Sequence, residues 1–310
     1  MELHIFTEPQ NGASYEQLSA FAQASEALGF AGFFRSDHYL SIHDASGLPG
    51  PTDAWATLAA LALETKRIRL GTLMTCATFR LPGPLAITVA QVDQMSQGRV
   101  ELGLGAGWYA AEHSAYGIPF PSPKERFERL AEQLEIISGL WAASEGSLYS
   151  FRGRHYQLQG APGLPKPRQR PGPPILVGGM GRRRTPELAA RYATEFNIAF
   201  RPISEARPQF QRVRQACEAR GRDPGDLRLS VALTACCGRT EVEVGDRARR
   251  IGQDLAGLAR SGAAGTPGQV RDQLRDFAEL GCSRIYLQML DLGDHDHLEL
   301  LAQELLPAFA

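Results

Sequence analysis

This chain of 310 residues has little net charge, no long apolar run and few cysteines. Its 33 basic and 34 acidic side chains give a formal charge of -1, which indicates no basic surface for nucleic acid. No apolar run reaches the roughly 18 residues that a membrane helix needs, and the opening residues, MELHIFTEPQ, lack the pattern of a signal peptide. We therefore expect a cytoplasmic protein that binds neither nucleic acid nor a membrane.

The cysteines, at positions 76, 217, 236, 237 and 282, include no CxxC pair. Their spacing indicates neither a disulfide framework nor a zinc site, so we interpret them as small buried side chains. One segment resembles a metal cluster, because it contains Asp291, Asp294, His295, Asp296 and His297. We interpret it instead as the start of a helix, since aspartate is favoured there by capping and by the helix dipole, and we expect no metal site.

Short apolar segments alternate with helical stretches along the whole chain, which is the pattern of repeated βα units and a parallel sheet. Eight segments have the length and composition of strands: 3–6, 32–36, 68–73, 100–104, 175–178, 195–199, 228–234 and 284–289. A chain of this length, with 43% hydrophobic residues, can bury the core of one large barrel. The expected fold is α/β, a (β/α)8 TIM barrel in which residues 1–310 form one domain.

Two helices can be predicted in detail. Ser14 and Gln17 have the spacing of a capping box at the start of a helix over 14–28. A second helix carries an apolar stripe that should pack on the barrel wall, made of Phe127, Leu130, Leu134, Ile137 and Trp141.

The segment 145–174 interrupts the alternation. Its first part, SLYSFRGRHYQL, alternates as a hairpin would, and a run rich in Pro and Gly, GAPGLPKPRQRPGPP, follows. We interpret the segment as a hairpin or loop insertion rather than a second domain. Insertions after barrel strands build the rim of the active site, so we expect this one to lie there.

The stretch VELGLGAGW at 100–108 leads from a buried strand into a glycine-rich turn. Gly105 and Gly107 lack side chains where the chain must turn or where a ligand must approach the backbone. The dinucleotide-binding fingerprint is incomplete, because Trp108 follows and the sixth-position glycine is missing. By itself the stretch does not identify a ligand.

In a barrel, catalytic side chains lie where strands end in loops. The second predicted strand ends at Asp37 and His38, which combine a carboxylate with an imidazole that can move protons near neutral pH. The third is followed by Thr75, Cys76 and Arg80. From these residues alone, both a structural and a catalytic role stay open for His38.

The fifth predicted strand runs into Gly178, Gly179 and Gly181, then Arg182–Arg184, and a helix that starts near Thr185. Backbone N–H groups of such a loop, placed before a helix N-terminus, form an anion site to which arginines add positive charge. The alternative is a solvated turn with a basic helix start. The order of strand, glycine loop and helix favours a phosphate site.

Five motifs occur together in one order: SDHY at 36–39, GTLMTCATFR at 71–80, LGLGAGW ending at 108 with Glu112 beyond it, RFERLAEQLEII at 126–137 and PILVGGMG at 174–181. In these motifs the chain resembles the bacterial luciferase-like superfamily, and within it the F420-dependent oxidoreductases. The resemblance covers residues 1 to about 200 and is much weaker from 201 to 310.

This resemblance implies a barrel that holds a flavin or deazaflavin ring at its C-terminal face. It places the ring near Asp37, His38, Leu73, Met74 and Thr75, with a non-proline cis peptide at Leu73–Met74. It assigns to cofactor binding also Gly107 and Glu112, and to the cofactor phosphate Gly178, Gly179, Met180 and Gly181. Arg182, with its two arginine neighbours, would meet the polyanionic tail of F420. Arg80 falls in a structural motif and receives no catalytic role.

The sugar-phosphate dehydrogenases of the same group carry an acidic residue where this chain has Trp108. We therefore expect a substrate other than a sugar phosphate. A pocket lined by Tyr39, Phe79 and Trp108, with Phe120 nearby, suits a neutral, partly apolar or aromatic molecule.

The resemblance predicts an oxidoreductase in which His38 exchanges a proton beside the ring and Asp37 assists it. With F420 the chemistry is hydride transfer to or from a small organic substrate. With FMN, the reduced flavin would activate oxygen in a two-component monooxygenase supplied by a separate reductase. A barrel that only stores a flavin is the third hypothesis.

Barrels of this family often dimerise, so we also expect a homodimer. The apolar helices within residues 53–97 are the expected interface.

Overall fold

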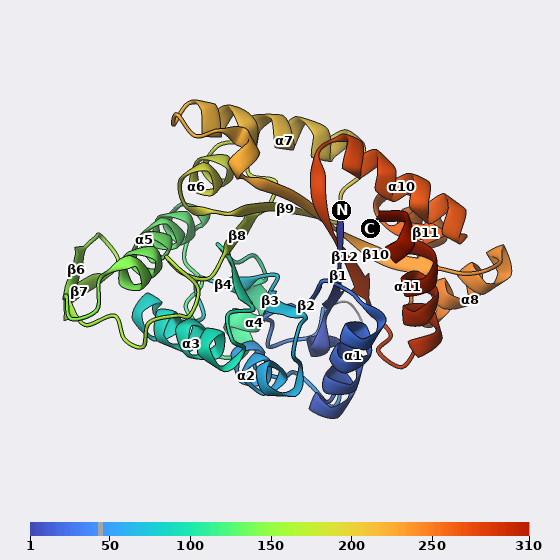
Figure 1. The fold of residues 1–310 in the computed structure, drawn as a ribbon, viewed down its shortest axis with the longest axis horizontal. Coiled ribbons are helices and arrows are strands. Elements are labelled where there is room, and N and C mark those ends of the chain that lie inside the picture. The colour runs from blue at the N-terminus through green and yellow to red at the C-terminus, as the bar shows by residue number, and fades with distance from the viewer. Residues whose placement is uncertain (43–45, 310) are drawn as a thin grey trace.

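The computed structural model, which describes residues 1–42 and 46–309, is a closed parallel barrel with helices around it (Figure 1). Its neighbouring strands are β1, β2, β3, β5, β8, β9, β10 and β12, and β12 pairs in parallel with β1 to close the ring. The (β/α)8 fold expected from the sequence is confirmed.

The strands are β1 Glu2–Thr7, β2 Gly32–Arg35, β3 Arg69–Thr72, β4 Thr75–Cys76, β5 Val100–Gly105, β6 Tyr149–Arg152, β7 Gln157–Ala161, β8 Ile175–Gly178, β9 Glu195–Ala199, β10 Arg228–Cys237, β11 Ala263–Gly265 and β12 Cys282–Met289. The helices are α1 Tyr15–Leu28, α2 Ala54–Glu64, α3 Pro82–Met95, α4 Ala110–Ala115, α5 Pro123–Ala142, α6 Arg184–Tyr192, α7 Ile203–Glu218, α8 Glu241–Arg250, α9 Leu255–Ser261, α10 Pro267–Glu279 and α11 His295–Phe309. Each of the eight predicted strands coincides with a barrel strand to within a few residues.

The two detailed helix predictions are confirmed. The Ser14 hydroxyl accepts a hydrogen bond from the backbone N–H of Gln17, and the Gln17 side chain accepts one from the N–H of Ser14. In α5, four of the five stripe residues are buried in the core, and Phe127 packs against it from the edge.

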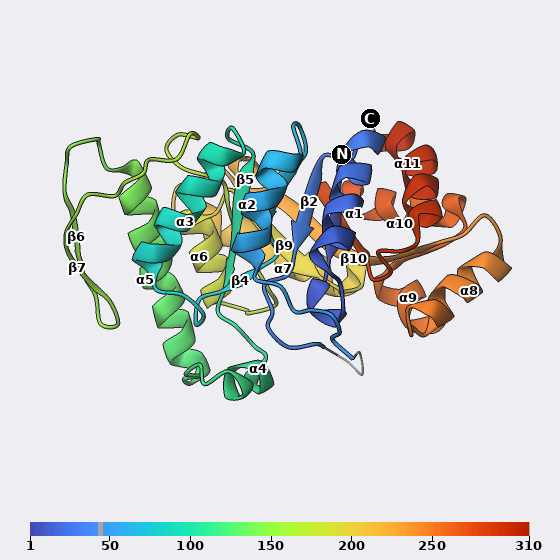
Figure 2. The same cartoon turned by 90° about the horizontal axis from the view of Figure 1, so that it is seen from below.

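The insertion at 145–174 does form a hairpin, since β6 and β7 pair in antiparallel fashion. It lies along the outer side of α5, where the Glu132 carboxylate accepts hydrogen bonds from the backbone N–H groups of Arg154, His155 and Tyr156 (Figures 1 and 2). All of 145–174 is described, and none of it lines the cavity presented below. The expectation that it builds the rim is therefore wrong, because the hairpin follows a helix rather than the carboxyl end of a barrel strand.

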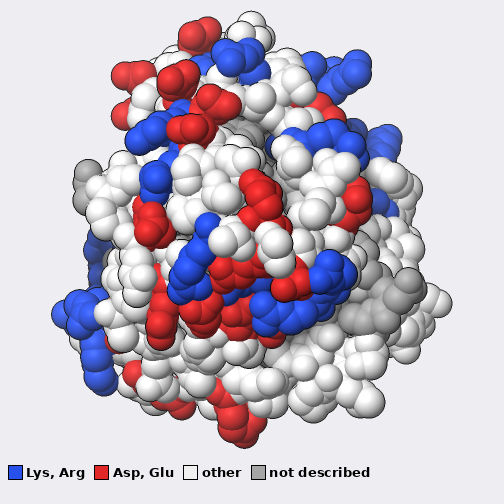
Figure 3. Space-filling model, turned by 90° about the vertical axis from the view of Figure 1, so that its right-hand side faces the viewer, with Lys and Arg blue, Asp and Glu red and all other residues white. Residues whose placement is uncertain are grey.

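The interpretation of the cysteines is confirmed, because all five are free and buried. The interpretation of segment 291–297 as a helix start is confirmed as well. Asp294 accepts a hydrogen bond from the backbone N–H of His297 at 2.9 Å and forms an ion pair with Arg247. On this outer side of the molecule, basic and acidic side chains of α8 and the start of α11 lie side by side (Figure 3). Within the described residues, no helix combines the length and apolar character needed to cross a membrane.

The two ends of the barrel differ in chemistry. α4 lies at one end and both chain termini lie at the other (Figure 2). At the end near the termini, Arg284 is buried inside the barrel and pairs with the buried carboxylates of Glu101 at 2.7 Å and Glu195 at 2.8 Å. These three residues stand near the starts of β12, β5 and β9, so this cluster belongs to the N-terminal end of the strands. In such barrels that end serves stability, and the opposite end carries the chemistry.

Two buried histidines make stability depend on pH. Burial lowers the pKa of both His4 and His297 from the ordinary 6.5 to about 4. As the pH falls below about 6.5, each histidine takes up a proton in the unfolded chain before it does so in the folded protein. The free energy of unfolding therefore decreases between about pH 6.5 and pH 4, by roughly 3 kcal/mol for each histidine.

The variant His297→Gln tests this coupling, because glutamine keeps an acceptor for the backbone N–H of Cys237 that His297 now binds at 2.9 Å. Urea unfolding at several pH values between 7 and 4.5 should give a shallower loss of stability in the variant than in the wild type. Identical pH slopes in the two proteins would show that His297 does not titrate in this range.

Candidate active site

A cavity of about 540 Å³ opens at the C-terminal end of the barrel. The ends of β1, β2, β3, β5, β8 and β9 surround it, and the α5 side chains Phe127 and Leu130 close one side. Of the residues predicted from the sequence, the following line it: His38, Leu73, Met74, Thr75, Gly107, Trp108, Glu112, Gly178, Gly179, Met180 and Gly181. These eleven predicted residues meet in one place, although they lie up to 143 positions apart in the chain, from His38 to Gly181.

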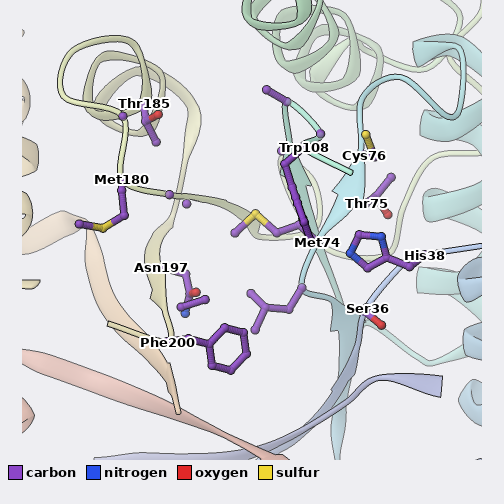
Figure 4. Close-up of a pocket in the computed structure, with 18 of the residues that line it drawn as sticks. Ser36, His38, Met74, Thr75, Cys76, Trp108, Met180, Thr185, Asn197 and Phe200 are labelled. Carbon is purple, nitrogen blue, oxygen red and sulfur yellow. The ribbon is translucent and has the colours of Figure 1, made fainter. Parts of the chain in front are cut away.

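The imidazole of His38 is held by the carboxylate of Glu112. Nδ1 of His38 lies 2.9 Å and 3.1 Å from the two carboxylate oxygens, and the backbone N–H of Tyr39 donates to the same carboxylate at 3.0 Å. An ionised carboxylate can only accept, so the pairing assigns a proton to Nδ1 and leaves Nε2 as the exchangeable position. His38 lines the cavity beside Trp108, and the two rings meet edge to face at 5.8 Å (Figure 4).

Asp37 is next to His38 in the chain but is not part of the cavity wall. Its side chain is 1% exposed and accepts hydrogen bonds from Arg80 at 2.5 Å and from the Thr75 hydroxyl at 2.9 Å. Successive residues at the end of a strand point in opposite directions, so when His38 faces the cavity Asp37 turns to the ion pair. The predicted direct role of Asp37 in catalysis and cofactor contact therefore has no support in the geometry, and Arg80 is structural as expected.

A bulge between β3 and β4 forms the floor of the cavity. The Leu73–Met74 peptide bond is cis, as the resemblance implied. The Thr75 hydroxyl, besides its bond to Asp37, accepts a hydrogen bond from the indole N–H of Trp55 at 3.0 Å. Figure 4 shows the Met74 side chain extending across the cavity toward the β8 side.

A loop of glycines forms the wall opposite His38. The backbone of Gly179 has φ +121°, which a residue with a side chain adopts only under strain. A Cβ atom at Gly181 would overlap the hydroxyl of Thr185, so a larger residue fits there only if the Thr185 side chain moves. Gly107 is similarly constrained, because it has φ +79° and a Cβ atom there would overlap the sulfur of Cys76. These positions let a ligand approach the backbone closely.

The predicted aromatic lining is correct in one residue and wrong in two. Trp108 lines the cavity, is 62% exposed and stacks on Tyr109 with ring centres 5.2 Å apart. Tyr39 and Phe79 pack on each other at 4.9 Å and do not line it. The Tyr39 hydroxyl donates a hydrogen bond to Asp53 at 2.9 Å instead of facing the cavity.

Two further residues named beside the site also lie elsewhere. Phe120 packs against the buried His113 with ring centres 4.4 Å apart. Arg182 is exposed and lies next to the glycine loop without lining the cavity. Burial raises the pKa of the Cys76 thiol, which does line the cavity, to about 11, so this cysteine is a neutral thiol rather than a nucleophile.

Sequence reasoning missed the contributions of β1 and β9 to the cavity, and Ser36 beside the predicted His38 at the end of β2. Phe6 and Ser36 line the cavity at the ends of β1 and β2, and Asn197, Phe200 and Arg201 line it where β9 ends. Phe200 has φ +55°, a conformation uncommon for a residue with a side chain and frequent at functional sites. The rule that strand ends carry chemistry, applied to β1 and β9 as it was to β8, would have identified Phe6, Asn197, Phe200 and Arg201.

Known proteins are similar to this chain both in sequence and in structure. Residues 1–256 match the family model described as luciferase-like monooxygenase. The chain is 36% identical over 179 residues to an F420-dependent glucose-6-phosphate dehydrogenase of Microbacterium testaceum, a match that covers 57% of this chain and 50% of that protein. The chain thus spans about half the length of the curated relatives it matches.

Two solved structures are similar over the whole chain. Monooxygenase RslO1 from Streptomyces bottropensis is 26% identical, with a TM-score of 0.83 and 100% of both chains covered. The coenzyme F420-dependent tetrahydromethanopterin reductase of Methanopyrus kandleri is 18% identical, with a TM-score of 0.84 over 100% of this chain and 99% of that one. At 18% identity, the similarity to the reductase shows a shared fold alone.

Proposed function

The chain belongs to the luciferase-like monooxygenase family, and from this premise we propose that it is an oxidoreductase that transfers a hydride between coenzyme F420 and a small, partly apolar organic substrate. The observation that carries the proposal is the His38–Glu112 pair at one side of the cavity, with the glycine loop of β8 at the other. The first can exchange a proton, and the second can bind a phosphate.

The residues present fit a deazaflavin. A cavity of about 540 Å³ lies within the range typical of cofactor and ligand sites, and apolar residues such as Leu73, Phe127 and Leu130 give it a surface for a flat ring. Gly178–Gly181 would hold the phosphate, and the exposed Arg182 would meet the polyanionic tail outside the cavity. When bound, F420 supplies a carbon centre that accepts or donates a hydride.

The chain's own residues would provide orientation and proton transfer. Glu112 holds Nδ1 of His38, so Nε2 can receive a proton from a substrate hydroxyl in one direction and return it in the other. Asp37 and Arg80 would support the cavity floor from behind, through the hydrogen bond from the Thr75 hydroxyl to Asp37, rather than reacting themselves. Trp108, at a position where the resemblance implies an acid in the sugar-phosphate enzymes, would offer the substrate an apolar face.

The second candidate is an FMN-dependent two-component monooxygenase that receives reduced flavin from a separate reductase. It is favoured by the likeness to RslO1, which extends over the whole of both chains at 26% identity. The same cavity and phosphate loop would serve FMN.

Turnover assays separate them. We expect the purified protein, without oxygen, to oxidise simple alcohols with F420 or to reduce enones and imines with reduced F420, followed by the change in deazaflavin absorbance. Oxygen consumption that depends on reduced FMN and a substrate, without any F420 turnover, would overturn the hydride-transfer proposal and establish the monooxygenase.

A further inference from the structure

A buried glutamine on α7 holds the glycine loop from behind. Gln209 is fully buried, and its Nε2 donates hydrogen bonds to the carbonyl oxygens of Gly179 at 3.1 Å and Gly181 at 2.9 Å. Both N–H bonds of the carboxamide are therefore used on one loop. Gln209 does not itself line the cavity.

The orientation of this carboxamide is fixed by its other atom. Oε1 of Gln209 accepts a hydrogen bond from Nη1 of Arg212 at 2.9 Å, three residues further along α7. A guanidinium can only donate, so the amide oxygen must face Arg212 and the amide nitrogen must face the loop.

The two hydrogen bonds from Gln209 determine where the N–H groups of the glycine loop point. In a trans peptide the C=O and N–H bonds of one unit point in opposite directions. When Gln209 holds the carbonyls of Gly179 and Gly181, the N–H groups of the same peptide units, those of Met180 and Arg182, point away from α7. Among the residues that the structure describes, neither of these N–H groups has a hydrogen-bond acceptor, whereas the N–H of Gly179 donates to Asn197.

We propose that Gln209 is a positioning residue that aims the N–H groups of Met180 and Arg182 at the phosphate of the bound cofactor. The inference rests on the proposed function, because it takes the glycine loop as the phosphate site. Through Gln209, helix α7 would then control the affinity for the cofactor phosphate and not for the ring. This helix lies outside the residues that carry the resemblance seen in the sequence.

The test compares ligands that differ in the phosphate. The wild type and Gln209→Met are titrated by fluorescence with FMN and riboflavin, which differ in the phosphate alone. They are also titrated with F420 and its chromophore 8-hydroxy-5-deazariboflavin, which lacks both the phosphate and the tail. We expect the wild type to bind the phosphorylated member of at least one pair about tenfold or more tightly, and we expect Gln209→Met to lose most of this preference while its Kd for the phosphate-free ring stays unchanged.

Two further variants test whether an effect of Gln209→Met is specific to the contact between Gln209 and the glycine loop. Arg212→Met leaves the glutamine in place but frees its oxygen, and we expect it to lower the phosphate preference by a smaller factor. Gln273→Leu removes a glutamine that likewise bonds to backbone, at Ala264 on β11 away from the cavity, and should leave the preference intact.

Different results would overturn the role of Gln209 and the phosphate site on which that role depends. A wild-type preference for the phosphorylated ligand that persists in both Gln209→Met and Arg212→Met would overturn the role of Gln209 and leave the phosphate site standing. A wild type without any such preference would overturn the phosphate site itself, and the inference with it.

Discussion

Replacing His38 by alanine is expected to lower kcat by roughly 100- to 10,000-fold while the Kd of the cofactor changes by no more than about threefold. The reason is that Nε2 of His38 is the exchangeable position of the His38–Glu112 pair at the cavity wall. The cofactor contacts proposed above lie mainly on the β3 bulge, α5 and the glycine loop. Steady-state kinetics and a fluorescence titration of the same preparation measure the two quantities separately.

A second histidine–glutamate pair provides a matched control. Nε2 of His155 lies 3.0 Å from a Glu128 oxygen, beside the hairpin and away from the cavity, so His155→Ala should keep its turnover. If His38→Ala retains full activity, the proposed proton transfer is wrong. If neither the wild type nor the variant turns over any substrate but both bind the cofactor, a flavin-storage role replaces catalysis.

Replacing Arg284 by methionine is expected to lower the free energy of unfolding by about 3–5 kcal/mol. Arg284 is 2% exposed and is paired with two fully buried carboxylates, those of Glu101 and Glu195. Removing the guanidinium leaves these carboxylates buried without a cation between them, although Arg69 still contacts Glu101 and Arg228 still lies 3.9 Å from Glu195. Denaturant unfolding followed by circular dichroism measures the loss.

The cause is tested by neutralising the carboxylates as well. Arg284→Met combined with Glu101→Gln and Glu195→Gln should recover part of the lost stability, because the two buried carboxylates are then neutral amides. A more exposed pair, Arg271 with Glu304 at 2.9 Å, has side chains that are 30% and 42% exposed and gives the comparison, since Arg271→Met should cost about 1 kcal/mol or less. Equal losses for Arg284→Met and Arg271→Met would show that burial of the cluster contributes nothing.

Much of the fold could be predicted because the signals are local. Buried parallel strands are short apolar runs between helical stretches, and a run such as 228–234 marks a barrel strand whatever its partners are. The place of the hairpin could not be predicted in the same way. Its sequence reveals the pairing of β6 with β7, but which end of the barrel it occupies depends on its following α5 rather than a strand.

The site was predicted in part for a related reason. The motif SDHY correctly marks the end of β2, and the resemblance to luciferase-like proteins inferred from it and four other motifs is confirmed by the family match. The sequence does not reveal which of the adjacent side chains faces the cavity. His38 does, whereas Asp37 and Tyr39 turn toward Arg80, a residue that follows a different strand.

The most direct test of the central claim is an equilibrium titration of the purified apoprotein with F420 and, separately, with FMN, following cofactor fluorescence at fixed salt. We expect F420 to bind with a Kd in the micromolar range or tighter and FMN to bind much more weakly. Tight binding of FMN with weak binding of F420 would contradict deazaflavin-dependent hydride transfer and identify an oxygen-consuming flavin enzyme.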